Sequence, residues 1–69
     1  MLGEQEAIVV EVNPVALHGV TYYDVAVTFT DGTGEQARLG PEGVPDHLQA
    51  GERILATRVA NMLISLRRP

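Results

Sequence analysis

The sequence contains no cysteine, no tryptophan and no lysine, and all five of its basic residues are arginines. Without cysteine, neither a disulfide nor a thiolate metal site is available to stabilise the fold. A chain of 69 residues supports one hydrophobic core at most, so we expect a single domain over residues 1–69. Self-association to a homo-oligomer is one of the few remaining ways for such a short chain to bury more surface.

Long apolar runs are also missing, because no run exceeds five residues whereas a membrane-spanning helix needs about 20. The first residues are acidic rather than basic, which is untypical of a targeting segment. We therefore expect a cytoplasmic protein with no membrane insertion. Nine acidic residues against five arginines give a net charge of −4, which repels phosphate backbones and disfavours nucleic acid as a partner.

Two stretches rich in β-branched residues predict the first strands. The first runs from Glu6 to Val12 and ends at Asn13-Pro14, because proline lacks the donor that a strand ladder needs. The second runs from Val20 to Thr30. Its core face consists of Tyr23, Val25, Val27 and Phe29, and the first strand alternates between one face with Ile8, Val10 and Val12 and another with Ala7, Val9 and Glu11.

The segment 31–35 predicts a β-hairpin that leads into a third strand over residues 35–40. A three-residue loop over 32–34 keeps apolar residues opposite one another, since it pairs Phe29 with Ala37 and Val27 with Leu39. It also places Gly34 at the left-handed position of the loop.

Two prolines and two glycines between Pro41 and Gly51 exclude a long helix there but allow a short helical turn near 45–49. We expect Val44 and Leu48 to close one end of the core.

The last stretch, residues 52–67, satisfies two periodicities. As a helix it would have an apolar stripe spaced by three and four residues, and the fold would be a three-stranded sheet with a C-terminal helix 52–67. As a hairpin it would have strands over 53–59 and 62–67 around a turn at Ala60-Asn61. That hairpin would pair Leu55, Thr57 and Val59 with Leu66, Ile64 and Met62. We favour the hairpin, because five strands can close a barrel and three strands leave an edge exposed.

A leucine-bearing turn at Leu48, followed by Gly51-Glu52-Arg53-Ile54, resembles the step that starts the fourth strand in small five-stranded barrels of the OB-fold or SH3-like type. The resemblance is one of architecture, and it implies an all-β fold with no particular active or binding motif. The long helix that many OB-folds carry between strands three and four is missing here.

Catalytic and metal-binding patterns are weak in this chain. His18 and His47 are far apart in sequence and lack zinc-type ligand spacing. The cluster of Glu42, Asp46 and His47 is interpreted as solvated loop polarity, and the glycines at 32 and 34 as turn residues, since no lysine follows them. We therefore expect a non-enzymatic protein with no cofactor and no metal.

Two binding hypotheses remain. The first is an interaction module that binds a protein partner or itself through the surface of residues 53–67, where Ile54, Ala56 and Leu63 are expected to face outward beside Ala7 and Val9. The alternative is an OB-type domain for single-stranded nucleic acid, which would use Tyr22, Arg38 and Arg58.

Overall fold

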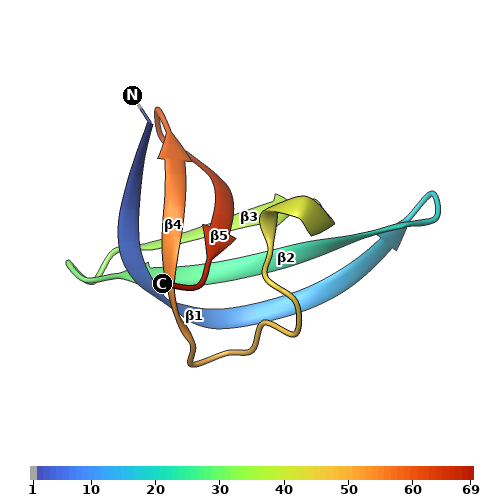
Figure 1. The fold of residues 1–69 in the computed structure, drawn as a ribbon, viewed down its shortest axis with the longest axis horizontal. Coiled ribbons are helices and arrows are strands. Elements are labelled where there is room, and N and C mark those ends of the chain that lie inside the picture. The colour runs from blue at the N-terminus through green and yellow to red at the C-terminus, as the bar shows by residue number, and fades with distance from the viewer. Residues whose placement is uncertain (1) are drawn as a thin grey trace.

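The fold is all-β: the structure, a computed structural model, describes residues 2–69, which contain no helix except one 3-10 turn. The C-terminal residues form a hairpin and not a helix, so the favoured prediction is confirmed. The elements in chain order are β1 (Leu2–Leu17), β2 (Val20–Phe29), β3 (Gly34–Leu39), the 3-10 turn η1 (Pro41–Gly43), β4 (Arg53–Val59) and β5 (Met62–Arg67) (Figure 1).

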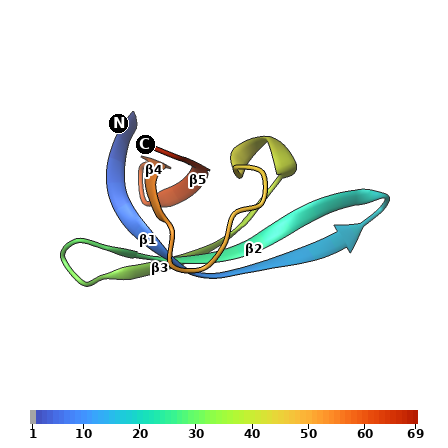
Figure 2. The same cartoon turned by 60° about the horizontal axis from the view of Figure 1, so that its bottom comes forward.

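The five strands form one antiparallel sheet in the order β3-β2-β1-β4-β5. The long strand β1 connects the two halves, because its first part pairs with β4 and its later part pairs with β2. β1 curves as it passes from one partner to the other, so the sheet curls round and brings β5 beside β3 (Figures 1 and 2). Within residues 2–69 no backbone ladder joins β3 to β5, so the sheet is not closed.

β1 does not end at Asn13-Pro14 as predicted but continues to Leu17. A two-residue turn at His18-Gly19 then leads directly into β2, with positive φ angles of 51° and 79°. Positive φ at both positions is the geometry of a type I′ hairpin. Residues 13–24 form a two-stranded ribbon, here called the arm, which projects from the body of the domain (Figure 2).

Pro14 is tolerated in β1 because of where its nitrogen points. In a hairpin with a two-residue loop, Leu17 and Val20 form a hydrogen-bonded pair, and bonded pairs alternate with non-bonded ones. Pro14, opposite Tyr23, therefore falls at a non-bonded position, with its nitrogen directed away from β2. The other edge of β1 is paired only as far as Val9, so the missing donor of Pro14 lies on a free edge.

A β-bulge in β1 changes which residues face the core. Val9 pairs with Val27 and Glu11 with Ala26, so Val10 is an extra residue in β1. Ala7 and Val9 are buried whereas Ile8 and Val10 are exposed, which corrects the expectation that Ala7 and Val9 lie on the outer face.

The β2–β3 hairpin has the predicted loop length but not the predicted position. The loop comprises Thr30, Asp31 and Gly32, because the Phe29 N–H donates to the Thr33 carbonyl over 2.8 Å. Gly32, with φ of +89°, takes the left-handed position that was expected of Gly34. The pairs are consequently Val25 with Ala37 and Tyr23 with Leu39 rather than those predicted. The observed register differs from the predicted one by an even number of residues, so the side chains of β2 keep their faces. The predicted core face of β2 is therefore confirmed.

The loop between β3 and β4 contains its helical turn at Pro41–Gly43, earlier than the expected 45–49. Leu48 is buried and Val44 packs against the core, as predicted. Gly43 fits closely against β5, since a Cβ atom there would lie 3.2 Å from the Ile64 carbonyl oxygen. The turn η1 therefore covers part of the β5 edge.

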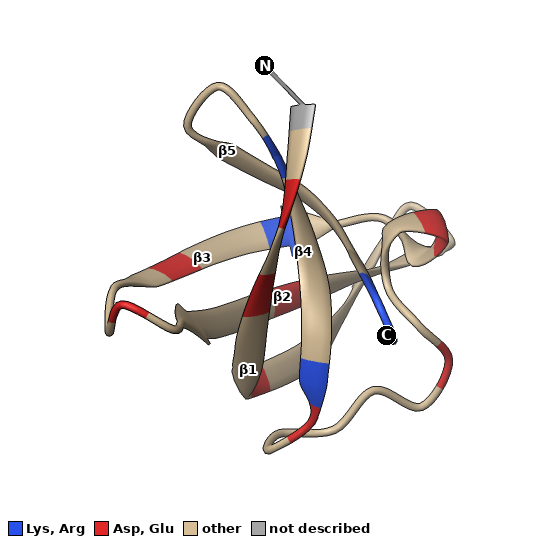
Figure 3. Cartoon of the chain, turned by 60° about the vertical axis from the view of Figure 1, so that its left-hand side comes forward, with Lys and Arg blue, Asp and Glu red and all other residues tan. Residues whose placement is uncertain are grey.

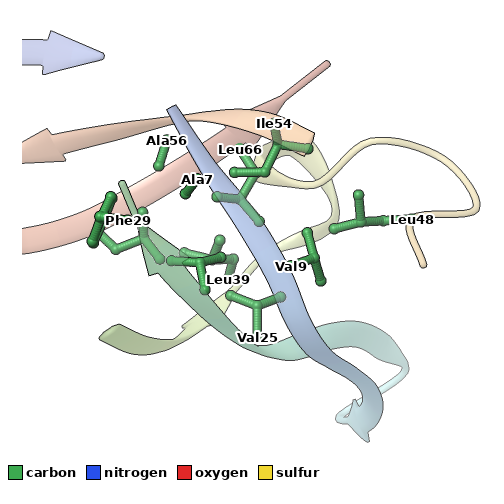
Figure 4. Packing of buried hydrophobic residues seen from close by; sticks show 11 residues of the cluster. Ala7, Val9, Val25, Phe29, Leu39, Leu48, Ile54, Ala56 and Leu66 are labelled. Carbon is green, nitrogen blue, oxygen red and sulfur yellow. The ribbon is translucent and has the colours of Figure 1, made fainter. Parts of the chain in front are cut away.

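β4 and β5 have the predicted bounds, and Val59 pairs with Met62 as predicted. The other predicted pairs are wrong, because a second bulge makes Ile64 an extra residue between Leu63 and Ser65. The positive φ in the connecting turn belongs to Ala60, at 55°, and not to Asn61. The buried core draws on all five strands and the η1–β4 loop and consists of Ala7, Val9, Val25, Val27, Phe29, Leu39, Leu48, Ile54, Ala56, Leu63 and Leu66 (Figure 4).

Candidate interaction surfaces

The residues expected to bind a partner through the β4–β5 surface are core residues. Ile54 and Ala56 are 0% exposed and Leu63 is 4% exposed, so none of them faces outward. In Figure 4, Ile54 and Ala56 lie beside Ala7 in the interior. The prediction placed the larger side chains inward, but small residues such as Ala7 and Ala56 fit the tightly curved interior better.

The side chains of β4 and β5 alternate in the opposite sense to the prediction. A different set of apolar residues therefore lies on the outer face. Val59, Met62 and Ile64, here called the tip patch, are 42%, 67% and 42% exposed at the end of the β4–β5 hairpin. Met62 faces outward as the cross-strand neighbour of Val59, and the bulge turns Ile64 out of the core. Further along β4 the outer face is covered, because Arg67 and Glu4 form a two-point ion pair across the strand, with contacts of 2.6 and 3.0 Å.

Arg58, directly before the tip patch, is held on three sides. Its guanidinium carbon lies 5.3 Å from the centre of the Phe29 ring, a cation–π arrangement. Its Nε lies 2.9 Å from Glu35 Oε1, although the N–H is not directed at that oxygen, so the contact is an ion pair rather than a hydrogen bond. Gln5 Oε1 accepts a long hydrogen bond of 3.4 Å from Nη1. These contacts fix the base of the tip patch.

Glu35 also connects the two edge strands of the sheet. Its Oε2 accepts a hydrogen bond of 2.8 Å from the backbone N–H of Leu63. A carboxylate of β3 thus satisfies a β5 donor that would otherwise face an unpaired edge. Together with Gly43 of η1, Glu35 limits access to the β5 edge and leaves the side chains of the tip patch as the exposed feature of this hairpin.

Every arginine forms an ion pair with a different acid. The pairs are Arg38–Asp24, Arg53–Glu6, Arg58–Glu35, Arg67–Glu4 and Arg68–Glu52. Five of the nine acids are used in this way, and the acids outside these pairs are Glu11, Asp31, Glu42 and Asp46. Figure 3 shows the arginine positions on β3, β4 and the C-terminal part of the chain among strands that also carry acids. Among the described residues, no arginine therefore lacks an acid within ion-pair distance.

Several of these acids have pKa values below their ordinary range. The Arg38 guanidinium hydrogen-bonds Asp24 and lowers the pKa of that carboxyl, and Arg67 does the same for Glu4. The pKa of Glu52 is lowered by Arg68 and by the backbone N–H of Gln49. The pKa of Asp31 is lowered by the hydroxyl and backbone N–H of Thr33.

The residues considered for nucleic-acid binding do not form one basic groove. Tyr22 and Arg38 lie on the outer face of β2 and β3, where Asp24 engages Arg38 through two hydrogen bonds of 2.7 and 3.0 Å. Arg58 lies at the end of the sheet over Phe29, paired with Glu35. Both arginines are thus already engaged by carboxylates.

A second exposed apolar surface lies on the outer face of the β1–β2 ribbon. Ile8, Val10, Leu17 and Val20 are all exposed, and they account for the large exposed hydrophobic residues outside the tip patch among residues 3–69. Residues 12–23, which contain nearly the whole arm, include no Asp, Glu, Lys or Arg. Sequence reasoning missed this surface because it ended β1 at Pro14, but the uncharged run was a visible signal.

The two histidines occupy separate turns, His18 at the arm tip and His47 in the loop before β4. The part of the chain that the structure describes contains no group of three His, Cys, Asp or Glu side chains placed to hold a metal ion. In the same residues no helix has the length and apolar character needed to cross a membrane.

Comparisons with known proteins give no relative from which a role can be transferred. No protein-family model matches the chain, and neither a curated protein nor a solved structure does so.

Proposed function

We propose that this domain is a non-enzymatic interaction module that binds a protein partner through the β4–β5 surface. The observation that carries the proposal is the tip patch, three exposed apolar side chains on one short hairpin whose base is fixed by Arg58 and Glu35. A rigid, exposed apolar cluster of this kind is typical of a protein-binding surface.

Charge defines the partner further. The chain carries a net charge of −4, and four of its nine acids lie outside the five ion pairs found among the described residues. All five arginines are neutralised within the domain. The complementary partner is therefore a protein with an apolar contact surface bordered by lysine or arginine.

We further propose that the architecture is a partly open five-stranded barrel of the OB-fold or SH3-like type. The curled strand order and the contact of β5 with β3 support this, because OB-folds are partly open five-stranded barrels. In such a barrel Glu35 replaces a backbone bond at the open seam between β3 and β5.

The test uses capture followed by measured binding. A protein captured by the immobilised full chain is purified, and its affinity is measured for the wild type and for Met62→Glu. We expect Met62→Glu to weaken binding at least about tenfold, equivalent to about 1.4 kcal/mol. Ala50→Glu, at an exposed loop position away from the tip patch, is the matched control and should leave the affinity unchanged.

Two results would contradict the proposal. One is a partner whose affinity is unaffected by both Met62→Glu and Val59→Glu. The other is tight binding of a fluorescent single-stranded oligonucleotide that weakens steeply with salt, which would favour the nucleic-acid alternative.

A further inference from the structure

We propose that Met62 is a reversible oxidation site, at which a hydroperoxide converts the thioether to a sulfoxide and thereby weakens binding through the tip patch. The inference deepens the proposed function and rests on it, because Met62 belongs to that patch. Among residues 3–69, Met62 is the most exposed large hydrophobic residue, at 67%. Figures 1 and 3 show the β4–β5 turn, next to Met62, standing clear of the other loops. A hydroperoxide therefore has open access to the sulfur.

The composition confines this chemistry to few positions. Cysteine and methionine are the side chains that peroxides oxidise stepwise at sulfur. The chain contains no cysteine and two methionines, Met1 and Met62. Within the tip patch, Val59 and Ile64 have no sulfur. Met62 is therefore the position at which an oxidant can change the chemistry of the patch.

The backbone around Met62 is fixed, so the oxidised side chain stays at the surface. Met62 pairs with Val59 across the hairpin turn, and the next residue, Leu63, is 4% exposed in the core. The Leu63 N–H donates to Glu35 over 2.8 Å, which holds this part of β5 against β3. Neighbouring side chains of a strand point to opposite faces, so the Met62 sulfoxide lies outside the core. Oxidation thus changes the surface and leaves the fold in place.

Oxidation replaces an apolar contact atom with a polar group. The sulfur attacks one oxygen of the hydroperoxide, an S–O bond forms and the O–O bond breaks. The sulfur gives up two electrons, and the second oxygen takes up the hydroperoxide proton and leaves as water or an alcohol. Arg58, the arginine closest to the patch in sequence, is already engaged by Glu35 and Phe29. An apolar partner surface over the patch would leave the sulfoxide oxygen without a donor.

The modification can be reversed, which distinguishes a switch from damage. Two methionine sulfoxide reductases exist, each specific for one epimer of the sulfoxide. A dithiol supplies two electrons and two protons, the S–O bond breaks, and the oxygen leaves as water while a disulfide forms. The exposure that admits the oxidant also admits these enzymes.

The first test treats the free full chain with hydrogen peroxide. Cleavage after arginine releases residues 59–67 as one peptide, which contains Met62 but not Met1. We expect this peptide to gain the mass of one oxygen atom, while the urea midpoint of the oxidised chain stays at the untreated value. Retention on a hydrophobic-interaction column should decrease, because the patch becomes more polar. A 59–67 peptide that resists peroxide, or an oxidised chain that unfolds, would overturn the proposal.

The second test measures binding to the protein captured by the immobilised full chain, with the peroxide removed before that protein is added. Oxidation of the wild type should weaken the affinity at least about tenfold, and treatment with both reductases should restore it. Met62→Leu is the matched variant, since its side chain has a similar volume and no sulfur. Its affinity should be the same before and after peroxide. An equal loss in Met62→Leu would assign the effect to another residue and overturn the role of Met62.

The binding data also separate this proposal from the proposed function. If Met62→Glu weakens binding and the sulfoxide does not, the oxidation switch is overturned while the tip patch remains the binding surface. If neither change affects binding, the tip patch is not the binding surface, and both proposals are overturned even where the 59–67 peptide is oxidised. Loss of affinity in both, with recovery after reduction, supports both proposals.

Discussion

Glu35 in β3 accepts a hydrogen bond from the backbone N–H of Leu63 in β5 over 2.8 Å, so a side chain joins two strands that share no backbone ladder. The same carboxylate lies 2.9 Å from Arg58, which stacks over Phe29. A single residue thus connects the sheet edges, the base of the tip patch and the aromatic end of the core.

Removing Glu35 should therefore destabilise the domain more than removing an ordinary surface acid. We expect Glu35→Ala to lower the unfolding free energy by about 1–3 kcal/mol, because the part-buried N–H of Leu63 loses its acceptor and the partly buried guanidinium of Arg58 loses its ion-pair partner. Glu35→Gln should cost less, since its amide oxygen can still accept from Leu63. Urea denaturation measures both, with exposed Glu42→Ala as control. Equal losses for the alanine and glutamine variants would show that charge alone matters.

Two isoleucines provide a matched test of the corrected strand faces. Ile54 is 0% exposed whereas Ile64 is 42% exposed. Ile54→Ala should cost about 2–5 kcal/mol of unfolding free energy, the usual range for cavities of this kind. Ile64→Ala should change it by no more than about 1 kcal/mol. The opposite ranking in thermal or urea unfolding would restore the originally expected faces.

The β2–β3 loop depends on the left-handed residue at position 32. Gly32→Ala should destabilise by about 1 kcal/mol, because φ of +89° strains any residue with a Cβ atom. Gly32→Asn should cost less, since asparagine adopts positive φ more readily. Gly34→Ala serves as the comparison, because Gly34 has no positive φ. A larger loss at position 34 than at position 32 would support the loop position that the sequence predicted.

Stability should decrease in acid. The pKa values of Glu4, Asp24, Asp31 and Glu52 are lowered in the folded state by their hydrogen-bond donors. A lowered folded pKa means that the unfolded chain binds protons more tightly, so the stabilisation is present at neutral pH and is lost as the pH falls below about 4. Urea midpoints between pH 7 and pH 3 should show this fall, and Glu52→Gln should reduce it. A midpoint that rises toward pH 3 would contradict this assignment.

The sequence pattern was sufficient for the fold class and for the bounds of β4 and β5, because alternation and turn residues are local signals. The core face of β2 was also predictable, since Val25, Val27 and Phe29 alternate without interruption. The core face of β3 was predictable as well, because Ala37 and Leu39 lie on it as expected, but the faces of β1, β4 and β5 were not. The extra residues Val10 and Ile64 reverse the alternation within β1 and β5, and no local pattern marks them as bulges.

The candidate surfaces were the least predictable part for the same reason. Ile54, Ala56 and Leu63 were assigned outward by counting large side chains, whereas the small interior selects by volume. The neutralisation of Arg38 and Arg58 was hidden as well, because Asp24 and Glu35 become their neighbours only through the tertiary register.

Pro14 has a consequence for how many copies can assemble. It removes a backbone donor from the free edge of β1, so a strand of another copy cannot extend the sheet past this point with a complete ladder. Addition of this β1 edge to a different edge of the next copy, such as that of β3, would repeat from copy to copy and produce filaments. A single proline therefore favours a finite assembly over open-ended polymerisation.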